Sequence, residues 1–265
     1  MLNTLVDTHA HLNFPDYQKD LKKVINRAVK NGVTKIICVS SNVADSKKAI
    51  KIAQKYPKIV YPAIGIHPQQ TDPQNPDSPE KQIKKLTKLA EKNQVIAIGE
   101  CGLDYSPAPP GEKDRTHKEQ FFLFKKQIEL AQKLSLPLII HCRKAFPEII
   151  EILNQHASHS LKGVFHCYSA GKKGIEKVNQ LDFYFGVDGN LTYDVGLQNV
   201  FAQIPLEKIL LETDAPFLSP EPLRNQRNEP KNVKMIAECL AQLKNVSFEK
   251  ICQITTKNVK KLFSF

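Results

Sequence analysis

The sequence predicts an α/β protein, a (β/α)8 TIM barrel with an extra C-terminal helix. Short β-branched runs alternate with segments of helical period along most of the chain, and eight such runs occur within 265 residues. A doubly wound sheet is the alternative, but no Gly-rich phosphate loop follows the first run. We therefore expect one barrel domain over residues 1–265 rather than two smaller domains.

Each predicted strand is a short apolar run rich in β-branched residues. Between the runs, apolar residues recur at helical spacing, most clearly in residues 21–29, 121–134 and 146–153. Two more helices are predicted over residues 233–243 and 248–262, and the second is the extra one. In chain order the strands are Thr4–His9, Val33–Ser40, Ile59–Ile66, Val95–Cys101, Leu136–His141, Gly163–Cys167, Phe183–Val187 and Ile209–Thr213.

Three Pro-rich loops follow predicted strands rather than predicted helices. They cover His67–Pro79, Ser106–Gly111 and Pro216–Pro230. In a barrel of this kind the loops after the strands build the active-site face. We therefore expect the functional residues in and beside these loops.

The composition is that of a globular protein, with 41% hydrophobic and 25% charged residues. No run approaches the ~20 apolar residues that a membrane span needs, and the first residues do not read as a secretory signal. We expect a cytoplasmic protein that binds no membrane and keeps its six cysteines as free thiols. The net charge of +11 would suit a polyanionic partner. Most of the excess is Lys scattered along polar helix faces, so the charge alone does not identify nucleic acid as the ligand.

The first predicted strand ends in a His-x-His pair. A strand period of two puts His9 and His11 on the same side of the chain, about 6.6 Å apart along it. Two imidazoles at that separation can chelate one cation. Taken alone the pair is weak evidence, because two histidines could equally flank a turn.

Four other predicted strands also end in an ionisable residue. These residues are Glu100, His141, His166 and Asp214. One such residue is usually a solvated loop start, but six that converge on one barrel mouth are poorly explained by chance. Four His and two carboxylates supply the nitrogen and oxygen ligands that suit Zn, Mn, Co, Ni or Mg.

Six ligands are too many for one catalytic ion with an open position. They suit two divalent metal ions that share a bridging carboxylate. Such a pair hydrolyses an ester, a phosphodiester or an amide, so the residues leave these substrate classes open.

The strings DTHAHLNF, GIHP, GECGLDY, IIHCRKA, FHCYS, LLETDAPFLSP and RNEP lie in this order over residues 7–230. They closely resemble the motifs of the TatD family of metal-dependent deoxyribonucleases, in the amidohydrolase superfamily. The resemblance implies a (β/α)8 barrel and hydrolysis of phosphodiester bonds in DNA, as a 3′-5′ exonuclease. The alternative is a hydrolase of another ester or amide on the same metals, such as an aminoacyl-tRNA deacylase. No obligate protein partner is implied.

The resemblance also implies roles for the six strand-end residues. One metal would be held by His9, His11 and Asp214 together with Glu100. The second metal would be held by His141 and His166 together with Glu100, which would bridge the two metals. As catalytic residues, Glu100 would hold both metals and Asp214 would orient or deprotonate the attacking water.

Three further residues are expected to bind substrate. By resemblance His67, in GIHP, contacts a phosphate, although a His before Pro could also be structural. Arg143 could present its guanidinium fork to a phosphate, and a salt bridge to the following helix is the alternative. Arg227, in RNEP, is a similar candidate. Asp104, after the fourth predicted strand, is a candidate for orienting a metal-binding His.

Overall fold

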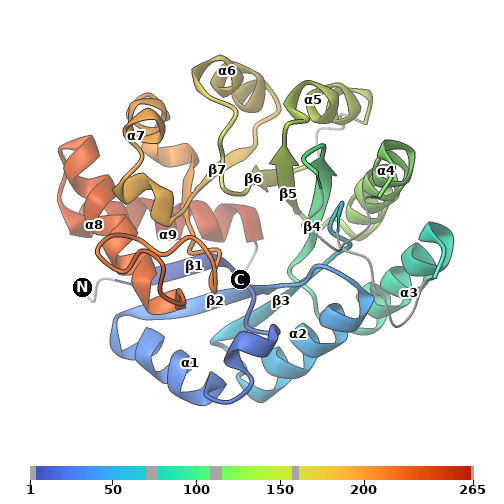
Figure 1. Ribbon diagram of the computed structural model, residues 1–265, viewed down its shortest axis with the longest axis horizontal. Coiled ribbons are helices and arrows are strands. Elements are labelled where there is room, and N and C mark those ends of the chain that lie inside the picture. Colours follow the sequence, from blue (N-terminus) through green and yellow to red (C-terminus); the bar gives the residue numbers. More distant parts are fainter. Residues whose placement is uncertain (1–3, 70–76, 108–114, 157–160, 264–265) are drawn as a thin grey trace.

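The computed structural model describes residues 4–69, 77–107, 115–156 and 161–263. Its eight parallel strands follow one another around a single sheet in the order β1 to β8. Figure 1 shows the helices arranged around these strands. The predicted (β/α)8 barrel is confirmed. The strands are β1 (Leu5–Ala10), β2 (Val33–Val39), β3 (Val60–Ile64), β4 (Ala97–Asp104), β5 (Leu138–Arg143), β6 (Gly163–Phe165), β7 (Tyr184–Val187) and β8 (Ile209–Leu211).

The helices lie between consecutive strands and after β8. Polar caps begin several of them, for example the reciprocal Thr116–Glu119 capping box of α4. Parts of two Pro-rich loops and His159 lie outside the described residues. The helices are α1 (Leu21–Lys30), α2 (Val43–Lys55), α3 (Pro79–Lys92), α4 (His117–Leu134), α5 (Phe146–Gln155), α6 (Lys172–Gln180), α7 (Val195–Phe201), α8 (Val233–Lys244) and α9 (Phe248–Phe263).

Both faces of the sheet are buried, as the apolar strands predict. In β2, Ile37 and Val39 point into the barrel, whereas Ile36 and Cys38 pack in the layer between strands and helices. All four are fully buried. This alternation explains why the second half of β2, Ile36–Val39, is a continuous apolar run.

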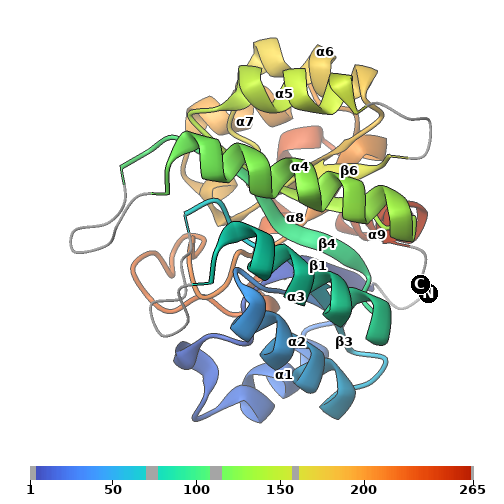
Figure 2. The same cartoon turned by 90° about the vertical axis from the view of Figure 1, so that its right-hand side faces the viewer.

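The extra helix α9 closes one end of the barrel. Its residues Val259, Leu262 and Phe263 pack against the side chains inside the barrel. Thr256 Oγ1 donates to Thr4 O at 3.0 Å and Asn258 Nδ2 donates to Ile209 O at 2.9 Å, which ties α9 to the starts of β1 and β8. In Figure 2, α9 lies on the side of both chain termini, and the orange loop after β8 lies on the opposite side. That loop side is where the strands end.

The barrel closes between β8 and β1 through hydrogen bonds just beyond β8. Asp214 N donates to His9 O at 2.9 Å and His11 N donates to Ala215 O at 2.7 Å. The buried Asp7 carboxylate accepts from Thr213 Oγ1 at 2.7 Å. The segments that carry three of the six expected metal ligands are therefore bonded to each other directly.

Three strands run past their predicted ends, and β1 does so by one residue, to Ala10. β4 continues from Cys101 to Asp104 and β5 continues to Arg143, because the two strands pair along that length. A Cβ at Gly102 would overlap the carbonyl oxygen of His141, and its φ of +143° is one that glycine tolerates. Asp104 is thus held in a strand and not, as predicted, in a loop.

Within the described residues, no helix is long and apolar enough to span a membrane.

Candidate metal centre

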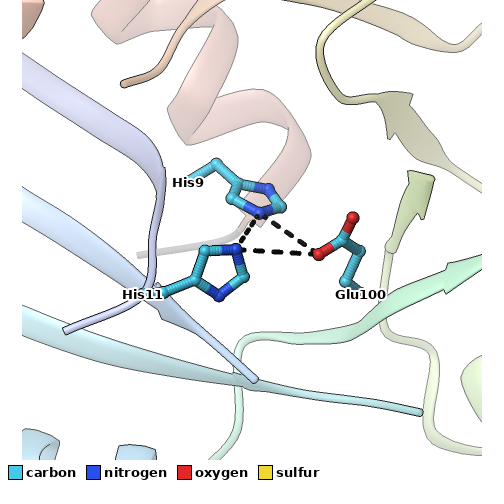
Figure 3. Close-up of side chains that lie close together, drawn as sticks. All are labelled: His9, His11 and Glu100. Carbon is cyan, nitrogen blue, oxygen red and sulfur yellow. Dashed lines mark hydrogen bonds and ion pairs between the residues drawn. The ribbon is translucent and has the colours of Figure 1, made fainter. Parts of the chain in front are cut away.

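Glu100 lies at the middle of the site, on β4, with its side chain buried. Its Oε2 faces the His-x-His pair, 3.5 Å from His9 Nε2 and 3.8 Å from His11 Nε2. Figure 3 shows these two rings turned toward the carboxylate. Its Oε1 faces the other way, 2.8 Å from His141 Nδ1 and 2.9 Å from His166 Nε2. One carboxylate therefore presents a separate oxygen to each of two histidine pairs.

The first group of ligand atoms is completed by Asp214. Its Oδ1 lies 3.5 Å from His9 Nε2 and 3.3 Å from His11 Nε2. Those two ring nitrogens are 3.3 Å apart. Ligands bound at about 2.1 Å to a tetrahedral ion are separated by about 3.4 Å. The spacings of 3.3 to 3.8 Å therefore fit one divalent cation held by nitrogen and oxygen donors.

In the second group, Glu100 Oε1 lies closer to its two histidines than Oε2 does to the first pair. Glu100 Oε1, His141 and His166 form a cluster whose ligand atoms all lie within 4.8 Å of one another. The spacings of 2.8 and 2.9 Å from Oε1 match the edge of about 2.9 Å expected around an octahedral ion with bonds of about 2.1 Å. The two sets of residues fit a pair of ions that share Glu100.

Backbone and carboxylate partners orient two of the ligand rings. His11 Nδ1 lies 3.1 Å from Val39 O, so a proton on Nδ1 leaves the Nε2 lone pair free for a cation. His141 Nε2 lies 2.9 Å from Asp104 Oδ2, which leaves Nδ1 directed at Glu100. The orienting role that the sequence suggested for Asp104 fits this geometry.

The carboxylates are held ionised by the histidines around them. Burial alone would raise the pKa of Glu100, but the neighbouring imidazoles outweigh it and hold that pKa well below its usual range. Burial likewise opposes ionisation of Asp214, and the hydrogen bond and charge of His11 still lower its pKa. Burial lowers the pKa of His9. Ionised carboxylates and neutral imidazoles are the forms that bind metal. At His11, His141 and His166 the nearby carboxylates outweigh burial and raise the pKa, so metal binding there would release protons.

His67 joins this site, as the sequence predicts. Its Nε2 lies 3.6 Å from Glu100 Oε1, and its ring meets His141 edge to face at 4.3 Å. Its Nδ1 accepts a hydrogen bond from Gln69 N at 3.1 Å, so the ring proton is on Nε2 and faces the centre. Burial lowers the pKa of His67 to about 3, which keeps this ring neutral.

The two candidate phosphate-binding arginines differ. Arg143 ends β5 with an exposed side chain, and the described part of the chain supplies it no ion pair. Arg227 instead forms two hydrogen bonds to Asp20, at 2.9 and 2.8 Å, and approaches Glu229 at 3.2 Å. Its guanidinium is thus engaged within the protein. Substrate binding by either arginine stays a prediction.

Glu212 is a buried carboxylate of the site to which the sequence gave no role. Its Oε1 accepts from Cys167 N at 2.5 Å and lies 3.7 Å from His166 Nδ1. Within the described residues, His166 Nδ1 and Glu212 Oε2 lack hydrogen-bond partners. A Cβ at Gly186 would lie 2.5 Å from Glu212 Oε1, so glycine makes room for the carboxylate. The available signal was a Glu in an apolar strand, two residues before Asp214 and so on the same face.

Cys167, beside His166, lies beyond the strand in which the sequence predicts it. β6 ends at Phe165, and Cys167 has a φ of +44°. Cys167 can therefore join His166 and Glu212 in one cluster of candidate ligand atoms. Burial raises the pKa of its thiol well above the usual range, which disfavours the thiolate needed for metal binding.

Comparison with known proteins gives a consistent family assignment. The family described as "TatD related DNase" matches residues 6–264. Relatives include the uncharacterized metal-dependent hydrolase YabD of Bacillus subtilis, 37% identical over 262 residues and covered to 98% on both chains. Deoxyribonuclease TATDN3 of Homo sapiens is 32% identical over 264 residues, which are 98% of this chain and 94% of that one. The crystal structure of the TatD homolog YJJV from Escherichia coli superposes with a TM-score of 0.89, at 29% identity, and covers 100% of both chains.

Proposed function

Because the chain belongs to the TatD-related DNase family of metal-dependent hydrolases, we propose that it cleaves phosphodiester bonds of DNA with two divalent metal ions. In this proposal, residues 1–265 act as one barrel domain. The observation that carries the proposal is that the two carboxylate oxygens of Glu100 face different histidine pairs. Oε2 faces His9 and His11, and Oε1 faces His141 and His166. One carboxylate between two sets of N/O ligands would hold two ions close together, which suits two-metal hydrolysis.

When bound, two such ions supply Lewis-acid chemistry, which activates water and stabilises charge on the phosphoryl and leaving oxygens. The residues of the chain supply orientation and proton handling. Asp214 holds a carboxylate at the edge of the first group, with 14% of its side chain exposed. Its lowered pKa keeps it ionised, so it can accept a hydrogen bond from the attacking water and orient it. Proton transfer from that water to Asp214 is the second part of its proposed role.

His67 and Arg143 would bind the phosphate. The Nε2–H of His67 faces the centre and can donate to a nonbridging phosphate oxygen, because Nδ1 is already occupied by Gln69 N. The exposed side chain of Arg143, two residues after His141, can pair with a neighbouring phosphate of the DNA substrate. Arg227 would contribute only after it releases Asp20, so we assign it the weaker contact.

The test is hydrolysis of end-labelled single-stranded and double-stranded DNA by the purified protein. EDTA should abolish cleavage while circular dichroism shows a retained fold, and Mg, Mn, Co or Zn should restore it. We propose 3′-5′ exonuclease action, so a 5′-labelled strand should shorten stepwise and a 3′ label should leave as a mononucleotide. Glu100→Ala is the matched inactive control.

The same purified protein distinguishes DNA cleavage from the alternative, hydrolysis of another ester or amide. Release of amino acid from aminoacyl-tRNA, with intact DNA under every metal, would overturn the proposal in favour of another ester hydrolase. Unfolding of the metal-free protein would indicate a structural metal instead.

A further inference from the structure

An exposed aromatic ring lies beside the first group of ligand atoms. Phe217 follows Asp214 by three residues and is 50% exposed. The other exposed large apolar side chains among the described residues are Val29, Phe121 and Val195, which lie on helices. An isolated exposed apolar side chain is ordinary, so its neighbours decide whether it has a role.

Phe217 belongs to a group of three rings. Phe14 stacks on His11 with centroids 4.5 Å apart and an interplanar angle of 18°. Phe217 meets Phe14 edge to face at 6.1 Å and meets His11 at 6.2 Å. His11 Nε2 in turn lies 3.3 Å from Asp214 Oδ1. The exposed ring of Phe217 is therefore a direct neighbour of His11, one of the residues expected to hold a metal.

The backbone that carries Phe217 is fixed on both sides. Phe217 N donates to Asp214 O at 2.9 Å, and Phe217 O accepts from Asn228 Nδ2 at 2.7 Å. Asn228 is fully buried and also donates to Thr213 O at 2.9 Å. Because this backbone is already held, only the two side-chain torsions of Phe217 have to be ordered when a planar ligand covers its ring.

We propose that Phe217, supported by Phe14, is a stacking platform for a nucleobase next to the phosphate held at the metal centre. This inference rests on the proposed function and names the part of the nucleic acid that the chain recognises there. Every purine and pyrimidine has a π-face, so the platform accepts any base and favours a nucleotide that carries one. A simple phosphodiester, or a strand that lacks the base at this position, lacks that contact.

The test compares two single-stranded oligonucleotides that differ only at the cleaved nucleotide. One carries a base there and the other carries an abasic tetrahydrofuran residue. For the wild type, kcat/KM should be roughly 5- to 150-fold higher with the base, the range that stacking on one aromatic ring supplies. Phe217→Ala and Phe217→Leu should bring this ratio close to one, while Phe217→Tyr should keep it.

Phe121→Ala is the matched control, because Phe121 is an exposed phenylalanine (38%) on α4 outside the metal centre. In Phe121→Ala, the ratio of kcat/KM for the base-containing and abasic strands should equal that of the wild type. A ratio near one in the wild type, or one that Phe217→Ala leaves unchanged, would overturn the platform. The Leu variant separates stacking from apolar packing, since a ratio that survives in Phe217→Leu would also refute a π-contact.

A binding measurement separates this inference from the proposed function. An oligonucleotide with 2-aminopurine at its 3′ end is titrated with protein in EDTA, and stacking quenches its fluorescence. Quenching that Phe217→Ala removes, without hydrolysis under any metal, would support the platform and overturn the nuclease. Hydrolysis of DNA with equal rates for the base and abasic strands would overturn only the platform.

Discussion

Replacement of Glu212 by Gln tests whether a carboxylate behind His166 tunes the metal centre. In the wild type, Cys167 N donates to Glu212 Oε1 at 2.5 Å. Gln keeps the shape of the side chain and an oxygen that can accept this hydrogen bond. It removes the negative charge that faces His166 Nδ1. We expect weaker metal binding by the second group of ligands with an unchanged fold.

The magnitude follows from the contact that is lost. Partners of metal-binding histidines are worth 10- to 100-fold in metal affinity, or about 1.4 to 2.7 kcal/mol. Glu212 Oε1 lies 3.7 Å from His166 Nδ1, beyond hydrogen-bonding distance, so it acts there through charge. We therefore expect a loss at the lower end, about 10-fold.

The assay is calorimetric titration of the metal-free protein with Mn²⁺, supported by the visible spectrum of the Co²⁺ form. Gly186→Ala is a second variant, because a Cβ there would lie 2.5 Å from Glu212 Oε1 and would displace the carboxylate without altering its charge. Gly186→Ala should also weaken metal binding by the second group of ligands. Equal affinity in the wild type and Glu212→Gln, with both proteins folded, would refute the effect of the Glu212 charge on metal binding.

Three further outcomes follow from the same structure. Asp214→Ala should abolish hydrolysis with little change in the melting temperature, because a carboxylate beside the expected water is lost; turnover at the wild-type rate would contradict its role. Arg143→Ala should raise KM for DNA several-fold more than it lowers kcat, since the exposed guanidinium contacts only substrate, and an unchanged KM would count against that contact. Asp20→Asn should reduce the free energy of unfolding near neutral pH by at most about 1 kcal/mol, because the pair with Arg227 is partly solvated. The hydrogen bond from Arg227 lowers the pKa of Asp20 from 3.8 to about 2, so this stabilisation is present above pH 4 and is lost as the pH falls toward 2. In urea titrations, Asp20→Asn should therefore lose less stability than the wild type between pH 5 and pH 2, and equal losses would refute the linkage.

Much of the fold could be predicted because it depends on short-range pattern. Apolar runs such as Val33–Val39 identify strands by composition, and their alternation with helical segments specifies a barrel. The strand ends were less certain. β4 reaches Asp104 because it pairs with β5, and the sequence of one strand does not reveal the length of its partner.

The candidate metal ligands could be predicted for the same reason. In a parallel barrel all strands end on one face, so an ionisable residue after each apolar run is brought to a common site. The structure does bring the six residues together. They are His9, His11, Glu100, His141, His166 and Asp214. The division of Glu100 between two histidine pairs, however, depends on side-chain rotamers across four strands.

What the sequence by itself determined was the class of fold and the kind of ligand, because both follow from residue type and period along one segment. Only the tertiary structure decided which groups are free to act. Arg227 is paired with Asp20, over 200 residues away, whereas Arg143 is exposed. Glu212 is behind His166, and Phe217 is beside Phe14 and His11, through contacts between distant segments. The contacts of Arg227 and Phe217 depend on the closure of β8 onto β1, which no local pattern encodes.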